Sequence, residues 1–189
     1  MNWLAHLLLT GPSQAARIGG ILPDFAKPPE LKSLAPEFQS GIRLHYQIDA
    51  FTDSHEVFKR SIRRIEPPVR RYGGIIVDVF YDHFLSVSWH LYSEQTLEDF
   101  VKEVYASFEG CRGHIPHSIM ERLKQMEAAN WLYSYRDLDG VRLTLNRIST
   151  RLRRPMYLGA GVDDLERHYE DFRDDFISYF PQLQKFVHS

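Results

Sequence analysis

Apolar side chains recur every three or four residues along most of the chain, as at Phe38, Ile42 and Ile48. This period places them on one face of an α-helix. A sustained two-residue alternation of Val, Ile and Thr, which would indicate half-buried strands, is hard to find in the sequence. The pattern therefore predicts an all-α fold.

Capping residues, prolines and glycines divide the chain into roughly seven to nine helices. We expect them at residues 2–10, 36–50, a short stretch after 53, 69–91, 96–109, 116–131, 141–153 and 163–180, with turns at 11–13, 19–24 and 67–68. Asp139 is the expected cap of the helix at 141–153, and Pro181 is expected to begin a terminal turn. The segment 69–91 also suits a buried strand, because Ile, Val and aromatic residues fill it.

The length of 189 residues and the hydrophobic content of 43% suit one domain with a substantial core, which we assign to residues 1–189. The single cysteine, Cys111, cannot form an intramolecular disulfide or the usual thiolate zinc site. The apolar run in residues 1–10 is far shorter than the ~20 residues that span a bilayer, and no Lys or Arg precedes it. We therefore expect a cytoplasmic protein with no membrane insertion.

Charge is balanced over the whole chain but not along it. The formal net charge of -2 excludes a globally polycationic nucleic-acid binder, so no nucleic-acid partner is expected. Residues 59–72 contain six basic side chains against one acidic one, and residues 142–154 contain five and none. Arg60, Arg63 and Arg64 share one helical neighbourhood, where they would hold an acidic macromolecule. The alternative is a solvated charged face.

Side chains that could hold a metal ion crowd into four segments of the first half, at residues 2–6, 24, 45–55 and 78–83. In the third segment, His45, Asp49 and Asp53 follow one another at four-residue spacing. As far as the helix continues, all three project from one face. Imidazole and carboxylate side chains on one helix face are a common way to present metal ligands.

The fourth segment, which contains Asp78, Asp82 and His83, lies in one of the most apolar stretches of the chain. Burying carboxylates there is costly unless a cation or hydrogen-bond donors compensate. Two helices facing one cleft would supply the mixed oxygen and nitrogen ligands of Mn²⁺, Mg²⁺ or Fe²⁺ sites. A structural polar network is the alternative interpretation.

Motifs for other chemistry are absent from the sequence. It contains no GxxxxGK[ST] phosphate loop, no GxSxG elbow and no HExxH pair. The Gly19-Gly20 pair lacks the strand, loop and helix context of a dinucleotide site. Hydrolysis by a metal-activated water is the simplest remaining choice.

Four motifs in order resemble the acyl carrier protein phosphodiesterases, namely MNWLAHL at 1–7, GGILPDF at 19–25, LHYQIDAFTD at 44–53 and VDVFYDHFL at 77–85. YRD at 135–137 looks like a fifth, and the resemblance covers nearly the whole chain. It implies an all-helical fold distantly related to HD-type phosphohydrolases, with Mn²⁺ as the metal. The implied reaction removes 4'-phosphopantetheine from a serine of holo-acyl carrier protein, an acidic substrate that suits the arginine run. The family commonly shows Asn where this chain has Gly20.

The resemblance leads us to assign site residues. The expected metal ligands are Asp24, His45, Asp49, Asp82 and His83. The candidate catalytic residues are His6, Asp53 and Asp78: His6 and Asp53 would transfer protons or orient ligands, and Asp78 is either a further ligand or a group that orients a histidine. Two other functions stay open, an HD-like phosphohydrolase acting on a nucleotide or other small phosphate ester, and a non-enzymatic helical adaptor for an acidic partner.

Overall fold

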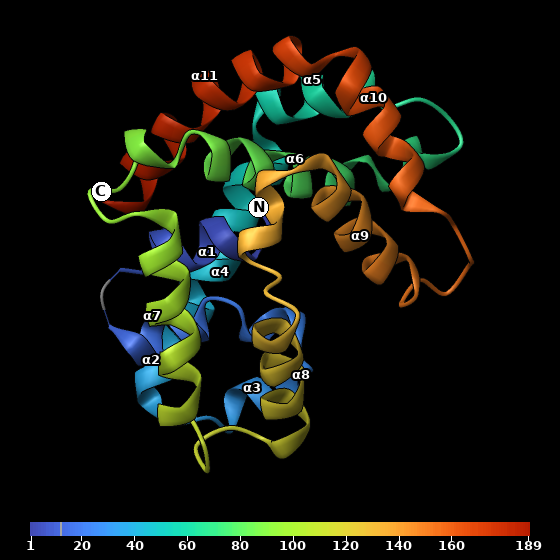
Figure 1. Ribbon diagram of the computed structural model, residues 1–189. Helices are drawn as coiled ribbons and strands as arrows, with labels where there is room; N and C mark the ends of the chain where they lie inside the picture. The colour runs from blue at the N-terminus through green and yellow to red at the C-terminus, as the bar shows by residue number, and fades with distance from the viewer. Residues whose placement is uncertain (12) are drawn as a thin grey trace.

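The computed structural model describes residues 1–11 and 13–189, and every regular element within them is a helix (Figure 1). The predicted all-α fold is confirmed. The α-helices are α1 (Trp3–Leu9), α2 (Gln14–Gly19), α3 (Pro28–Lys32), α4 (Pro36–Ser54), α5 (Glu56–Arg64), α6 (Gly73–Val87), α7 (Leu97–Gly110), α8 (His117–Ala128), α9 (Leu138–Ser149), α10 (Gly161–Arg167) and α11 (Tyr169–Val187). Five 3-10 turns join them, namely η1 (Leu22–Asp24), η2 (Val69–Tyr72), η3 (Trp89–Leu91), η4 (Tyr133–Arg136) and η5 (Leu158–Ala160).

Side-chain caps start several helices where the sequence predicts them. Asn2 Oδ1 accepts a hydrogen bond from the Trp3 amide at 2.9 Å, and Thr96 accepts from the Asp99 amide at 3.1 Å. The segment 69–91, which also suited a strand, forms α6 between η2 and η3. A helix surrounded by other helices can bury apolar side chains on nearly every side, which accommodates the apolar character of this segment.

Some predicted boundaries are wrong. Helices α2 and α3 were not predicted, because five or six residues carry too little periodicity to reveal a helix. The cap of α9 is Asp137, whose side chain accepts from the Gly140 amide at 2.7 Å, and not Asp139. Pro12 of the expected first turn lies outside the described residues.

The end of the chain also differs from the prediction. The single helix expected at 163–180 is two helices, α10 and α11, because the backbone leaves the helical conformation at His168. Pro181 lies inside α11 instead of starting a turn. It costs the helix one hydrogen bond, while the buried neighbours Phe180 and Leu183 hold that part of α11 against the core. No helix in the described part of the chain is long and apolar enough to cross a membrane.

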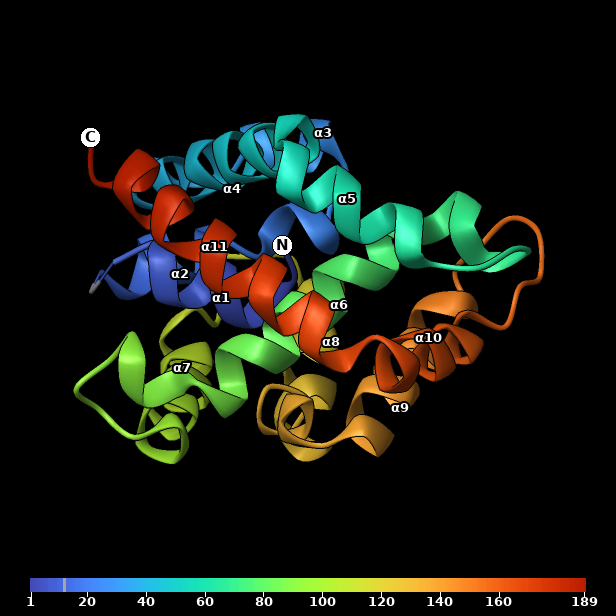
Figure 2. The same ribbon diagram turned by 90° about the horizontal axis from the view of Figure 1, so that it is seen from above.

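Helix α6 lies at the centre of the molecule, with α1 beside it (Figures 1 and 2). Helix α11 packs along α4, α5 and α6, and α9 contacts α6 on another side. Phe80, Tyr81 and Phe84 of α6 are fully buried against aromatic side chains of α11 such as Phe176. This arrangement brings α1, α4 and α6, which carry three of the four polar segments, next to one another.

Glycines allow α2 and α4 to approach at backbone distance. A Cβ atom on Gly41 would lie 1.8 Å from the Ala16 carbonyl oxygen, and one on Gly19 would lie 2.3 Å from that of Phe38. Any side chain at these positions would force the helices apart. The close approach places the end of α2, and with it the Gly20 carbonyl group, against α4.

Candidate active site

Helix α4 presents His45 and Asp49 on the same face. Nε2 of His45 lies 3.1 Å from Oδ2 of Asp49. His6 of α1 reaches the other oxygen of the same carboxylate, with Nε2 at 3.2 Å from Oδ1. The two imidazole rings stack with their centroids 4.2 Å apart. Two histidines from different helices therefore converge on one carboxylate.

The orientation of His45 is fixed from behind. Its Nδ1 lies 2.8 Å from the Gly20 carbonyl oxygen and therefore carries a proton that it donates. In the neutral ring, Nε2 then has a lone pair that points toward the Asp49 carboxylate. Protonation of His45, or a cation shared by the two atoms, makes this contact favourable.

Position 20 has no room for a side chain in this molecule. A Cβ atom on Gly20 would lie 2.7 Å from Cγ2 of Thr10. The Asn that the family resemblance leads us to expect at this position would therefore collide with Thr10. Gly20 contributes to the site through its carbonyl group, which needs no side chain.

His6 is fully buried and binds through one nitrogen only. Its Nε2 lies 3.1 Å from the Met1 carbonyl oxygen and 3.2 Å from Asp49, and both atoms are acceptors. Without a cation, the proton of a neutral His6 therefore belongs on Nε2, and a metal ion bound at this nitrogen would displace it. Its Nδ1 is buried and has no hydrogen-bond partner within residues 1–11 and 13–189.

Burial and mutual hydrogen bonding shift the pKa values of these three groups. Burial alone would raise the pKa of Asp49, but hydrogen bonds from His45 and His6 hold it well below its usual range. Burial opposes the charged form of His45, yet the contacts with Asp49 and the charge of Asp24 raise its pKa. For His6 burial outweighs the contact with Asp49, and its pKa falls. Asp49 is therefore an anion at neutral pH.

The donor set of this group suits a divalent transition-metal ion. One ligand atom from each of His6, His45 and Asp49 lies within 4.8 Å of the others. Two imidazole nitrogens and a carboxylate oxygen match the preferences of Mn²⁺ and Fe²⁺. The residues thus fit the kind of cation that the resemblance implies.

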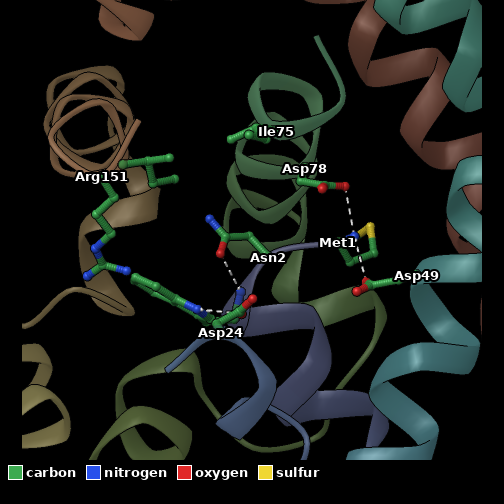
Figure 3. Close-up of a pocket in the computed structure, with 9 residues that line it drawn as sticks. Met1, Asn2, Asp24, Asp49, Ile75, Asp78 and Arg151 are labelled. Carbon is green, nitrogen blue, oxygen red and sulfur yellow. Dashed lines mark hydrogen bonds and ion pairs between the residues drawn. The ribbon is translucent and has the colours of Figure 1, made fainter. Parts of the chain in front are cut away.

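A pocket of about 220 Å³ adjoins the group (Figure 3). A water molecule takes about 30 Å³ in the liquid, so the pocket has room for a phosphoryl group and several waters. Asp24, Asp49 and Asp78 contribute carboxylates to its wall, and Arg151 contributes a guanidinium. The other lining residues are Met1, Asn2, Trp3, Ile75 and Ile148.

Two of the pocket carboxylates are held by specific contacts. The Trp3 indole N–H donates to Oδ2 of Asp24 at 2.8 Å, and the indole itself stacks on Phe25 and Trp131 at 5.6 and 5.5 Å. Oδ1 of Asp78 lies 2.7 Å from the Met1 amine. Burial raises the pKa of Asp78 to about 6 although the amine opposes the shift.

The structure places other predicted site residues outside this pocket. Asp82 is fully buried, and its oxygens accept from the amides of Leu4 and Ala5 at 2.7 and 3.2 Å, so it caps the start of α1. Burial raises its pKa to about 7. His83 contacts the Tyr135 carbonyl oxygen at 2.7 Å and the Tyr169 hydroxyl at 2.9 Å. Asp53 is exposed near the end of α4. Ligand or catalytic roles for these three residues stay predictions.

The three arginines predicted to bind a partner are in different environments. Arg60 and Arg64 both bind the carboxylate of Asp175, which is 1% exposed, and Ser61 donates to the same carboxylate at 2.7 Å. Arg63 is exposed and forms no ion pair within the described part of the chain. Arg60 and Arg64 therefore hold α5 against α11.

Sequence reasoning missed Trp3 and Arg151 as site residues. Trp3 lies in the first family motif, but nothing in its spacing indicates that the indole positions Asp24. Arg151 follows Arg147 by four residues, which places both on the same side of α9 and its C-terminal extension. The sequence shows this spacing, but it does not show the pocket that lies beside Arg151.

Comparison with known proteins extends over the whole chain. The sequence profile of the family described as "Acyl carrier protein phosphodiesterase" matches residues 1–183. Proteins with that name from Pectobacterium atrosepticum and Photorhabdus laumondii are each 28% identical over 98% of this chain, covering 96% and 94% of their own lengths. One from Enterobacter sp. (strain 638) is 29% identical over 97% of this chain and 95% of its own. No solved structure matches, so the expected relation to HD-type phosphohydrolases stays a prediction.

Proposed function

The chain belongs to the acyl carrier protein phosphodiesterase family, a family of enzymes, and we propose on that basis that it removes 4'-phosphopantetheine from holo-acyl carrier protein. Water adds to phosphorus and the bond from phosphorus to the serine oxygen breaks. A proton from the water goes to the serine oxygen, directly or through a protein group. The products are apo-acyl carrier protein and free 4'-phosphopantetheine.

His6, His45 and Asp49 would hold the metal ion, for which Mn²⁺ is the first choice and Mg²⁺ or Fe²⁺ are alternatives. When bound, the ion would act as a Lewis acid and lower the pKa of a coordinated water. The Gly20 carbonyl keeps the His45 ring turned so that Nε2 faces the site. Asp49 remains ionised at neutral pH, because its two histidine contacts favour the carboxylate.

Asp24 is the carboxylate that we assign to proton transfer. It lines the pocket, is exposed, and is fixed through Oδ2 by the Trp3 indole. A carboxylate that is held in place but open to solvent can accept a proton from water and pass it on. Asp78 is less suited, because it is only partly exposed and pairs with the Met1 amine.

The observation that carries the proposal is the convergence of His6 and His45 on Asp49 beside a pocket, in a chain that matches the family over residues 1–183. The test is to incubate the purified protein with holo-acyl carrier protein and Mn²⁺ and to measure the intact mass of the carrier. We expect the loss of one phosphopantetheine, and no loss in EDTA. An unchanged holo mass with Mn²⁺, Mg²⁺ and Fe²⁺ would contradict the proposal, and turnover of small phosphate esters alone would support the alternative phosphohydrolase.

A further inference from the structure

The pocket beside His6, His45 and Asp49 has opposite charges on its two sides. Asp49 and Asp78 lie on one side, on α4 and α6, and Arg151 lies on the other, just after the end of α9 (Figure 3). Asn2 lies between them. The side of Asp49 and Asp78 suits a cation. The Arg151 guanidinium suits an anion, and Asp24 is the third carboxylate of the pocket and acts on Arg151 through its charge.

Asn2 carries a hydrogen-bond donor with no acceptor. Its Oδ1 accepts from the Trp3 amide, which fixes the side chain, and Asn2 as a whole is only 8% exposed. Its Nδ2 is buried and has no partner within the described residues. Buried donors are nearly always bonded, so one that is left unpaired in a pocket wall indicates a place for a ligand acceptor.

Arg151 is a cation without a neutralising partner. It forms no ion pair in the part of the chain that the structure describes. Burial lowers the pKa of Arg151, Arg122 lowers it further, and the charge of Asp24 acts in the opposite direction. Arg147, one turn earlier, stacks on Trp131 at 4.8 Å and adds a second positive charge to this side.

We propose that the Arg151 guanidinium and the Asn2 amide form an oxyanion subsite that binds the phosphate group of the substrate. The planar guanidinium matches two phosphate oxygens at once, and Nδ2 of Asn2 donates to an oxygen beside them. The phosphorus atom then lies between Arg151 and the His6–His45–Asp49 group. This inference rests on the proposed function, since it assigns the place of that reaction's phosphate.

The test is the binding of inorganic phosphate to the full-length protein with Mn²⁺ present, measured by isothermal titration calorimetry. Arg151→Gln removes the charge, and Asn2→Asp keeps the oxygen that caps α1 while replacing the amide donor with an acceptor. Each should weaken phosphate binding about tenfold to a hundredfold, the usual effect of losing a charged hydrogen bond. Arg151→Lys should be intermediate, because a lysine keeps the charge but not the two-point contact.

Arg153→Gln is the matched control, since Arg153 carries the same charge two residues away but does not line the pocket. It should bind phosphate within about twofold of the natural chain. Circular dichroism and metal content should be the same for all variants. Equal phosphate affinity in the Arg151→Gln and Arg153→Gln proteins, or no phosphate binding by the natural chain, would overturn the subsite.

These experiments distinguish a failure of the proposed function from a failure of the proposed subsite. If holo-acyl carrier protein is not cleaved but phosphate binding depends on Arg151, the anion subsite stands and the assigned reaction is wrong. If the carrier is cleaved and Arg151→Gln leaves phosphate binding, KM and kcat unchanged, the reaction stands and the subsite is wrong.

Discussion

Nε2 of His45 faces Oδ2 of Asp49 across 3.1 Å, and the two residues are one turn apart on α4. The four-residue spacing places both side chains on one face of the helix, and the Gly20 carbonyl turns the imidazole toward Asp49. His6 then joins from α1 through the other oxygen of the same carboxylate. Because both histidines depend on Asp49, removing that carboxylate leaves two buried rings without their shared acceptor.

Replacing His45 with Ala or Asp49 with Asn should therefore empty the proposed metal site. Removing a contact that only supports a metal ligand usually lowers metal affinity about tenfold to a hundredfold. We expect a larger loss of Mn²⁺ affinity here, because a ligand itself is removed, and turnover should fall with it. Elemental analysis after dialysis measures the metal. His90→Ala, at an exposed histidine of η3, is the control and should change neither quantity. Full metal content and turnover in both site variants would place the metal elsewhere.

The approach of α2 to α4 gives a prediction about stability. Gly41→Ala should lower the free energy of unfolding by about 3 kcal/mol, because the new methyl group overlaps the Ala16 carbonyl oxygen and neither backbone can move cheaply. It should also displace the Gly20 carbonyl from His45 and weaken metal binding. Urea unfolding and metal titration measure the two effects.

Gly74→Ala is the matched control for this substitution. A Cβ atom on Gly74 meets no atom within 4 Å, and the residue lies in the first turn of α6. Alanine there should leave stability unchanged or raise it by up to about 1 kcal/mol, since it favours the helix. A Gly41→Ala protein as stable as Gly74→Ala would show that α2 and α4 tolerate separation.

Much of the fold follows from local sequence signals, and its exceptions have local causes. The caps Asn2 and Thr96 and the periodicity of α4 are properties of a few neighbouring residues. The ambiguity of 69–91 is settled by surroundings that sequence does not reveal, because other helices cover α6 on several sides. The course of α11 through Pro181 depends likewise on its packing against the core.

The candidate site divides in the same way. His45 and Asp49 could be paired from their spacing. All the residues that line the pocket except Ile75 come from segments that the motifs mark or from the basic run at 142–154. Which of these residues meet depends on how α1 lies against α4 and α6. That geometry turns Asp82 toward the start of α1 and places His6 beside Asp49. The sequence instead led us to expect Asp82 as a metal ligand and His6 as a group that transfers protons or orients ligands.

Asp82 should make the protein less stable as the pH rises. Burial raises its pKa to about 7 from 3.8, so between those values the folded state holds a proton that the unfolded chain has lost. The free energy of unfolding therefore falls with rising pH, by at most about 1.4 kcal/mol per pH unit from this one group, and levels off above pH 7. Asp82→Asn should remove this component.

Urea unfolding in EDTA at several pH values between 4 and 8 compares the natural chain with Asp82→Asn. As the pH rises, the unfolding free energy of the natural chain should fall relative to that of Asp82→Asn. Asp53→Asn removes an aspartate from an exposed position and controls for the loss of a surface charge. Parallel curves for the natural chain and Asp82→Asn would show that Asp82 does not titrate in this range.

The contacts of Asp175 change what can be expected of the arginines on α5. Asp175 is 1% exposed and binds Arg60, Ser61 and Arg64 together. Breaking a buried ion pair costs about 3 to 5 kcal/mol. Arg64→Glu would remove one partner of Asp175 and place a second negative charge beside this carboxylate, which then keeps only Arg60 and Ser61. Charge reversal at Arg64 therefore lowers the stability of the fold, and any effect on the docking of a partner cannot be separated from that loss.

Arg63 separates docking from folding, because it lies on the same helix but is exposed and forms no ion pair in the described part of the chain. Arg64→Glu should lower the unfolding free energy by about 3 kcal/mol or more, whereas Arg63→Glu should change it by less than about 0.5 kcal/mol. If α5 docks an acidic carrier, Arg63→Glu should raise KM for holo-acyl carrier protein at constant kcat and metal content. That increase should shrink in 1 M salt, where the Debye length is about 3 Å instead of about 8 Å at 0.15 M. An unchanged KM would identify this arginine as part of a solvated face and confine the role of α5 to binding α11 through Asp175.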